Sequence, residues 1–205
     1  MLPLPVHAHT FLAGLAQDYV AQQHAPTRTE LTVLFVDIAD STATVLHQPP
    51  EVALALVQRF MGIVTEIALA HCGDVKDYEG DGALLYFESV PEATQAAVAI
   101  RHALAHAQPE GSAPLQARLS LHVGSIIVGV IGSALRRSVA LIGPSIPIAS
   151  RLLKHIPPGG IIATEAVVER LRQEAPAFAQ RFKVWDPCLV LKGVEEECVS
   201  AFHLP

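Results

Sequence analysis

Two aspartates stand where apolar segments end, and their types suit the binding of a divalent cation. Asp37 closes the segment 31–38 (LTVLFVDI), and Asp81 lies between Gly80 and Gly82, 44 positions further on (81 minus 37). Two carboxylates brought together at strand ends disfavour each other's ionisation. Mg²⁺ relieves that repulsion and binds to one or two carboxylates plus substrate phosphates. Spacing alone leaves open a second interpretation, in which Asp37 caps a helix and Asp81 is an ordinary turn residue.

The elements that must position these aspartates alternate between strand and helix patterns. The segment 31–38 is β-branched and almost wholly apolar, which predicts a strand buried on both faces. Residues 75–79 and 83–87 predict a hairpin with Asp81 at its tip. Further strands are expected at 115–123, 126–131, 138–142 and 160–163 and in the tail from residue 182, and helices at 51–70, 91–106, 145–155 and 165–172. Glycine-containing turns are expected between the strands of the 115–142 region.

This order predicts an α+β domain, an α/β sandwich with helices over a mostly antiparallel sheet. Residues 30–205 are expected to form that domain. Residues 1–29 are expected to be a leader with a short amphipathic helix, because apolar side chains recur there at helical spacing.

Composition excludes several classes of protein. A formal net charge of −6 argues against a nucleic-acid partner. Three cysteines (Cys72, Cys188 and Cys198) with no CxxC pattern suit a reducing compartment better than a disulfide scaffold. We find no signal peptide and no apolar stretch of about 20 residues. A cytoplasmic protein that does not bind membranes is therefore expected.

Six segments, in order, resemble the signature segments of class III adenylate/guanylate cyclases. They are residues 34–42 (LFVDIADST), 78–87 (YEGDGALLYF), 121–133 (LHVGSIIVGVIGS), 141–152 (LIGPSIPIASRL), 158–164 (PGGIIAT) and 191–194 (LKGV). Each segment alone is a weak signal, but the resemblance covers residues 31–204. The chain is identified from it as a member of this family, with the family's ferredoxin-like α/β sandwich.

The resemblance implies a homodimer that converts a nucleoside triphosphate to a 3′,5′-cyclic nucleotide and pyrophosphate. Asp37, Asp81 and the backbone carbonyl of Ile38 would hold two divalent ions, Mg²⁺ or Mn²⁺. Arg151 of the other subunit would stabilise charge on the phosphates, and Lys192 would contact the terminal phosphates.

Three positions depart from the family pattern. Pro147 stands where the family has an asparagine that orients the ribose. Asp77 and Ala140 stand where adenylate cyclases have a lysine and an Asp or Thr that read the base, and Lys76 is expected on the opposite face of its strand from Asp77. A carboxylate accepts from the N–H edges of guanine and uracil, so GTP or UTP is expected to be favoured over ATP. Tyr78 or Tyr86 is a candidate to fill the pocket around a pyrimidine.

The same departures leave a second function open, a weak or inactive cyclase-like domain that serves as a regulatory or dimerisation module. His122 and Gly124 are expected to be structural, a core histidine before a glycine turn. No His-x-x-x-His, Gly-x-Ser-x-Gly or Walker-type pattern supports zinc, hydrolase or ATPase chemistry.

Overall fold

The computed structural model describes residues 25–41, 47–107, 115–133, 135–194 and 198–205. The strands are β1 (Thr27–Ile38), β2 (Asp74–Glu79), β3 (Gly82–Phe87), β4 (Ala117–Ser133), β5 (Arg136–Ile142), β6 (Ile161–Thr164), β7 (Lys183–Leu189) and β8 (Val199–Leu204). The helices are α3 (Pro50–Ala70), α4 (Val90–His106), α5 (Ser145–Leu152), α6 (Glu165–Glu174) and α7 (Pro176–Ala179), with a 3₁₀ turn η1 (Leu153–His155) after α5. The predicted leader helix lies outside the described residues.

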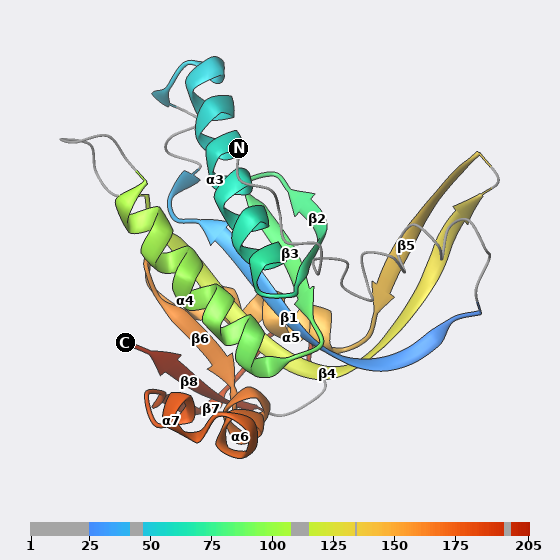
Figure 1. Cartoon of the computed structure of the whole chain (residues 1–205), viewed down its shortest axis with the longest axis vertical. Coiled ribbons are helices and arrows are strands. Elements are labelled where there is room, and N and C mark those ends of the chain that lie inside the picture. Colours follow the sequence, from blue (N-terminus) through green and yellow to red (C-terminus); the bar gives the residue numbers. More distant parts are fainter. Residues whose placement is uncertain (1–24, 42–46, 108–114, 134, 195–197) are drawn as a thin grey trace.

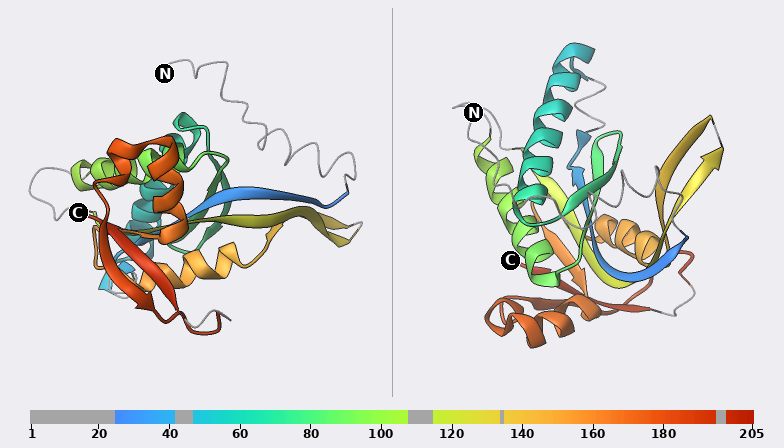
Figure 2. Two further views of the ribbon diagram at one scale, coloured as in Figure 1. Left: turned by 90° about the horizontal axis from the view of Figure 1, so that it is seen from below. Right: turned by 45° about the vertical axis from the view of Figure 1, so that its right-hand side comes forward.

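One sheet organises the described chain, in the order β2-β3-β1-β4-β6-β8-β7, with β5 paired to β4. All of its pairs are antiparallel except that of β4 with β6. Helices α3, α4 and α6 cover one face, and α5 covers the other (Figure 1; Figure 2, left). The predicted α+β sandwich with a mostly antiparallel sheet is confirmed.

Strands β1 and β3 form the centre of the domain. Residues 31–36 and all six residues of β3 are buried. Their side chains alternate between a large cluster beneath α3 and α4, which includes Leu34 and Leu85, and a smaller cluster beneath α5, which includes Phe35 and Leu84. Burial on both faces explains why the sequence reads as an unbroken apolar run.

The β4 strand departs from the expected arrangement. Two strands with a turn at Gly124 were expected, but β4 runs without a break for 17 residues. A Cβ at position 124 would lie 2.6 Å from Oγ of Ser145. Gly124 is therefore required for close packing of the start of α5, and not for a turn. The outer half of β4 pairs with β5 in a ribbon that projects from the body of the domain (Figure 1).

Helix α3 has the length and composition of a segment that could cross a bilayer. The expectation that no such segment exists is therefore wrong. Three evenly spaced side chains of α3, Phe60, Val64 and Ala68, are fully buried. That spacing is typical of an amphipathic helix packed on a domain core.

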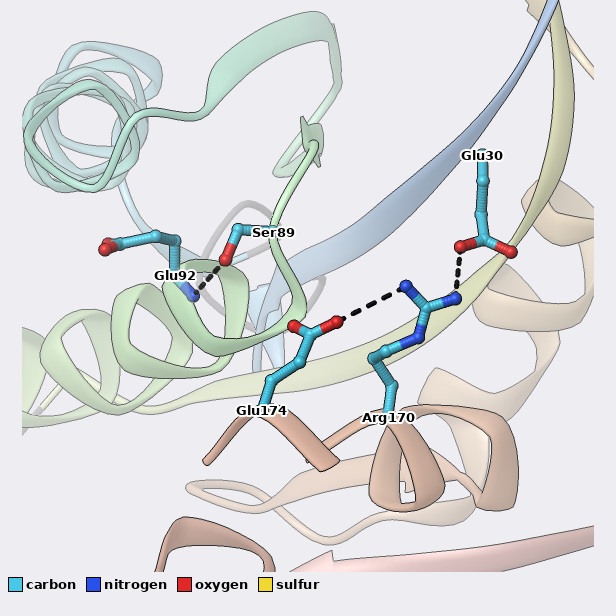
Figure 3. Close-up of polar contacts among 5 residues, drawn as sticks. All are labelled: Glu30, Ser89, Glu92, Arg170 and Glu174. Atoms are coloured by element: carbon cyan, nitrogen blue, oxygen red, sulfur yellow. Dashed lines mark hydrogen bonds and ion pairs between the residues drawn. The ribbon is translucent and has the colours of Figure 1, made fainter. Parts of the chain in front are cut away.

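Figure 3 shows the cap of α4 at Ser89 and the ion pairs of Arg170 on α6. Ser89 caps α4 by accepting from the amide of Glu92 at 3.3 Å, and the Glu92 carboxylate contacts Nδ1 of His71 at 3.1 Å. These contacts join the start of α4 to the end of α3. On α6, Arg170 forms ion pairs with Glu30 of β1 and with Glu174.

Candidate active site

Strand pairing brings Asp37 and Asp81 to the same end of the sheet. Asp37 lies opposite Gly82 in the β1–β3 ladder, and Asp81 directly precedes Gly82. The amide of Ile38 donates to the carbonyl of Asp81 at 3.2 Å. A Cβ at position 82 would lie 3.1 Å from the carbonyl oxygen of Val36 and 3.3 Å from Oδ1 of Asp37. Glycine at position 82 therefore leaves room for the Asp37 carboxylate.

The environment of Asp37 disfavours its charged form. Burial, the negative charge of Asp81 and a hydrogen bond with Asp81 together raise the pKa of Asp37 from 3.8 to about 6. The guanidinium of Arg118, which faces Asp37 across the β1–β4 pair, opposes the shift. A partly buried carboxylate beside a second one is the arrangement that a cation stabilises.

Polar side chains beside the two aspartates form further contacts around them. The Ser41 hydroxyl donates to Oδ2 of Asp81. Arg118 also approaches Asp40, with 3.5 Å between Nη2 and Oδ1. Ser41 was missed in the sequence, where it lies within the segment 34–42.

The donor set around Asp37 and Asp81 fits divalent metal ions. Carboxylate and backbone oxygens are the ligands that Mg²⁺ and Mn²⁺ prefer. Ile38 lies between the two aspartates, where its backbone can contribute. Within the described residues, no group of three or more His, Cys, Asp or Glu side chains could hold a metal. This suits ions whose remaining ligands come from substrate phosphates and water.

A cavity of about 330 Å³ adjoins Asp37. It carries acidic Asp37 and Glu79 and basic Arg118 and Lys154, and the rest of its wall is Phe35, Val36, Gly82, Ala83, Ser150 and Leu153. Arg118 and Lys154 were missed in the sequence. The register that sets Arg118 opposite Asp37 would have identified Arg118 once β1 was paired with β4.

Arg151 faces a different part of the chain from this cavity. Its neighbours Ser150, Leu153 and Lys154 line the cavity. The Arg151 guanidinium instead lies beside the segment between β7 and β8, with Nη2 3.5 Å from the position that a Cβ on Gly193 would take. Arg151 is half-buried, and no hydrogen bond or ion pair joins it to another described residue.

Lys192 lies at the turn that approaches Arg151. The amide of Val194 donates to the carbonyl of Leu191 at 3.1 Å, and Gly193 has a φ of +73°. This is the geometry of a turn with glycine in its third position. Lys192 is exposed. The structure therefore brings Arg151 and the Lys192 turn together, apart from the aspartate pair.

The two predicted base-reading residues do not share a row of the sheet. Asp77 pairs with Leu84, in the row of Phe35 and Ser120. Ala140 pairs with Gly129, nine residues further along β4 (129 minus 120), and is buried in the projecting ribbon.

The prediction that Lys76 is separated from Asp77 by strand alternation is wrong. A β-bulge between Val75 and Asp77 interrupts the alternation, and the side chains of Lys76 and Asp77 form an ion pair. The Lys76 side chain is 13% exposed and that of Asp77 55%. The Asp77 carboxylate therefore already has one cationic neighbour.

The two tyrosines proposed to fill the pocket differ in their surroundings. Tyr86 is buried in the cluster beneath α5, and its hydroxyl donates to Oδ2 of Asp74 at 2.8 Å. Burial and the Asp74 carboxylate raise the pKa of Tyr86. Tyr78 is 54% exposed, and its hydroxyl is hydrogen-bonded to Oγ1 of Thr65 of α3 at 2.7 Å. Only Tyr86 lies on the α5 side of the sheet.

His122 contacts Oγ1 of Thr164 at 2.9 Å, and burial lowers its pKa to about 4. Its imidazole is therefore neutral at physiological pH and bonded within the fold, as a core histidine should be. Pro147 lies in the first turn of α5, where the missing amide hydrogen leaves no intrahelical bond unmade.

Comparison with known proteins identifies a family. Residues 23–187 match the family model of the adenylate and guanylate cyclase catalytic domain. An uncharacterised protein of Mycobacterium tuberculosis is 32% identical over 156 residues, which cover 72% of this chain and 28% of that protein. Adenylate cyclase 1 of Rhizobium meliloti is 29% identical over 139 residues, which cover 62% of this chain and 21% of that protein. The chain thus spans less than a third of these relatives.

Solved structures share the fold at low sequence identity. The adenylyl cyclase CyaB from P. aeruginosa superposes with a TM-score of 0.77 at 21% identity, covering 89% of this chain and 96% of that one. The guanylate cyclase domain of RhGC from Catenaria anguillulae, solved in complex with GTP, gives 0.76 at 17% identity, covering 89% and 98%.

Proposed function

The chain belongs to the adenylate and guanylate cyclase catalytic-domain family, and from that premise we propose that it is an active nucleotidyl cyclase. The observation that carries this proposal is that Asp37 and Asp81 lie at the same end of the β1–β3 pair. Asp37 lines a cavity there that has two cationic side chains, Arg118 and Lys154. The substrate is a nucleoside triphosphate, and the products are a 3′,5′-cyclic nucleotide and pyrophosphate.

In this proposal the chain's residues bind and orient the triphosphate. Asp37, Asp81 and Ile38 would hold two Mg²⁺ or Mn²⁺ ions, which when bound lower the pKa of the ribose 3′-hydroxyl. The 3′-oxygen forms a bond to the α-phosphorus as the bond to the bridging oxygen of pyrophosphate breaks. Arg118 and Lys154 give the cavity positive charge beside Asp37, where phosphate oxygens would lie.

We propose that a second copy of the chain completes each site. Arg151 points toward Gly193, away from the cavity that its helix neighbours line. Arg151 and Lys192 of one chain can therefore reach nucleotide phosphates held by Asp37 and Asp81 of another. A two-fold homodimer would then have two equivalent sites.

An assay with each of the four nucleoside triphosphates tests this function. With Mn²⁺ or Mg²⁺, the purified protein should release a cyclic nucleotide and pyrophosphate from at least one of them. If a confirmed dimer formed no product from any of the four, the result would favour the alternative function, a regulatory or dimerisation module. The absence of a ribose-orienting side chain at Pro147 is the observation that favours that alternative.

The same assay tests the choice of base. We propose that GTP or UTP is favoured over ATP. The half-exposed Asp77 carboxylate can accept hydrogen bonds from the N–H groups on the edge of guanine or uracil. A tenfold preference for ATP in kcat/KM, roughly 1.4 kcal/mol, would refute this. Asp77→Asn should blur discrimination among the four nucleotides.

A further inference from the structure

Two of the three cysteines form a bond that the sequence pattern did not predict. Cys188 and Cys198 are joined as a disulfide, with their Cα atoms 4.9 Å apart and a sequence separation of 10. The expectation of cysteines without a disulfide is wrong for this pair. Cys72 is the free, exposed cysteine of the chain. The match to the family model ends at residue 187, so the bonded pair lies just beyond it.

The disulfide joins two strand ends. Cys188 is the penultimate residue of β7, and Cys198 directly precedes β8. The bond therefore holds together both ends of the segment that contains Lys192 and Gly193. Cys188 is exposed, so a reductant in solution can reach its sulfur.

The segment closed by this bond packs on the helix that carries Arg151. Leu189 and Leu191 share a buried cluster with Ile148 and Leu152 of α5. Ile148 and Leu152 flank Arg151 in the sequence. Movement of the segment relative to α5 would therefore change the surroundings of the Arg151 guanidinium.

The turn itself contacts Arg151. Gly193 lies against the guanidinium, and Lys192 precedes it. The cations of Arg151 and Lys192 thus keep their relative position only while this turn stays against α5. The restraints on the turn are, first, the apolar cluster together with the pairing of Leu189 with Val199 between β7 and β8, and second, the disulfide. Thiol–disulfide exchange can remove the second without disturbing the first.

We propose that Cys188–Cys198 is a thiol–disulfide exchange site that sets the activity of the cyclase, with dithiol reductants as its substrates. This inference rests on the proposed function. A thiolate of the dithiol attacks Sγ of Cys188, and Cys198 leaves as a thiolate. The second thiol of the reductant then displaces Cys188. The reductant ends as a disulfide, both cysteines end as thiols, and two electrons have moved to the protein.

Reduction does not alter Arg151 or Lys192 chemically, but their side chains are then less well positioned. Because phosphate-binding side chains act through their geometry, a displacement on the order of 1 Å is enough to slow the reaction substantially. We expect kcat/KM to fall by about tenfold on reduction and to recover on reoxidation.

Kinetics of the full chain in two redox states test the proposal. Oxidised protein should titrate with one free thiol, that of Cys72, and protein treated with dithiothreitol with three. Cys188→Ser should behave in both states like the reduced protein. Cys72→Ser is the matched control and should respond to dithiothreitol as the unmodified chain does. If the enzyme is active and the thiol counts confirm both redox states, equal kcat/KM values for the oxidised and reduced protein would overturn the proposal.

Hydrogen exchange separates this proposal from the proposed function. Amides of residues 189–194, including that of Val194, should exchange faster after reduction, and those of β1 should not change. Unchanged exchange at residues 189–194 would overturn the exchange site whether or not the chain is active. Faster exchange in a chain inactive with all four nucleotides would support the exchange site and overturn the proposed function.

Discussion

Asp37 and Asp81 are positioned by the backbone of two paired strands, whereas Arg151 and Lys192 are positioned by side-chain packing and a disulfide. The aspartates lie beside one continuous ladder, with a backbone hydrogen bond between Ile38 and Asp81. The two cations come from α5 and from a turn 41 residues later (192 minus 151). The position of the Arg151 side chain against this turn depends on the buried cluster of Ile148, Leu152, Leu189 and Leu191 and on Cys188–Cys198.

The two regions also have complementary electrostatic needs. Asp37 is partly buried beside Asp81, and its pKa rises because of that burial first and the charge of Asp81 second. Arg151 makes no ion pair with a described residue. Under the proposed function, metal ions would satisfy the first region and phosphates the second, so a metal–nucleotide complex would satisfy both.

The largest effect should come from removing either aspartate. Asp37→Ala or Asp81→Ala should abolish cyclisation, because the remaining carboxylate cannot hold two ions, while the fold and the dimer stay intact. Steady-state rates, melting temperatures and molar mass would check this. Glu174→Gln, at an exposed ion pair on α6, is a control that should leave the rate unchanged.

Residual activity decides the assignment of these ligands. If either alanine variant kept more than about a tenth of the rate, the loss would be under about 1.4 kcal/mol. The aspartate replaced in that variant would then not be a metal ligand, and the assignment of the pair as the metal site would be wrong.

The second effect tests whether the two regions meet across subunits. Inactive Asp37→Ala and inactive Arg151→Ala chains, mixed in equal amounts, should regain about a quarter of the original rate. Half of the dimers are then mixed, and one of the two sites in each has an intact aspartate pair and an intact Arg151. No recovery despite proven subunit exchange would mean that Arg151 acts within its own chain or not at all.

The sequence was most informative where contacts are local. Asp37 lies at the end of an apolar run and Asp81 just before one, and strand and turn patterns of a few residues placed both correctly. The unbroken apolar run at residues 31–36 also predicted burial on two faces. The helix at α5 was predicted despite Pro147, since proline is compatible with a first turn.

Features set by distant contacts were missed. Gly124 reads as a turn residue, because nothing near it in sequence indicates that Ser145 packs against it. Arg118 and Lys154 have no motif of their own and reach the cavity through strand register and helix packing. The Cys188–Cys198 bond has no short-spacing signature, and the bulge at Lys76 has no glycine to mark it.

The smallest effect concerns the cost of holding the aspartates together without metal. The folded-state pKa of Asp37, about 6, lies above its ordinary value of 3.8. Between these values the folded chain keeps a proton that the unfolded chain has lost. The stability that this group contributes is therefore present below about pH 4 and is lost as the pH rises to about 6.

The Asp37→Asn substitution removes the titration. In EDTA, the melting temperature of the variant should therefore rise relative to that of the unmodified chain across this pH window, and the difference should stay constant above it. A shift of this size corresponds to at most about 3 kcal/mol, and solvent screening at a half-buried carboxyl should reduce it to about 1 kcal/mol, or a few degrees. Mn²⁺ at pH 7 should close the gap by stabilising the unmodified chain alone. A difference that stays flat from pH 4 to pH 7 would mean that Asp37 is not held against Asp81, and that the anionic region is no more strained than the cationic one.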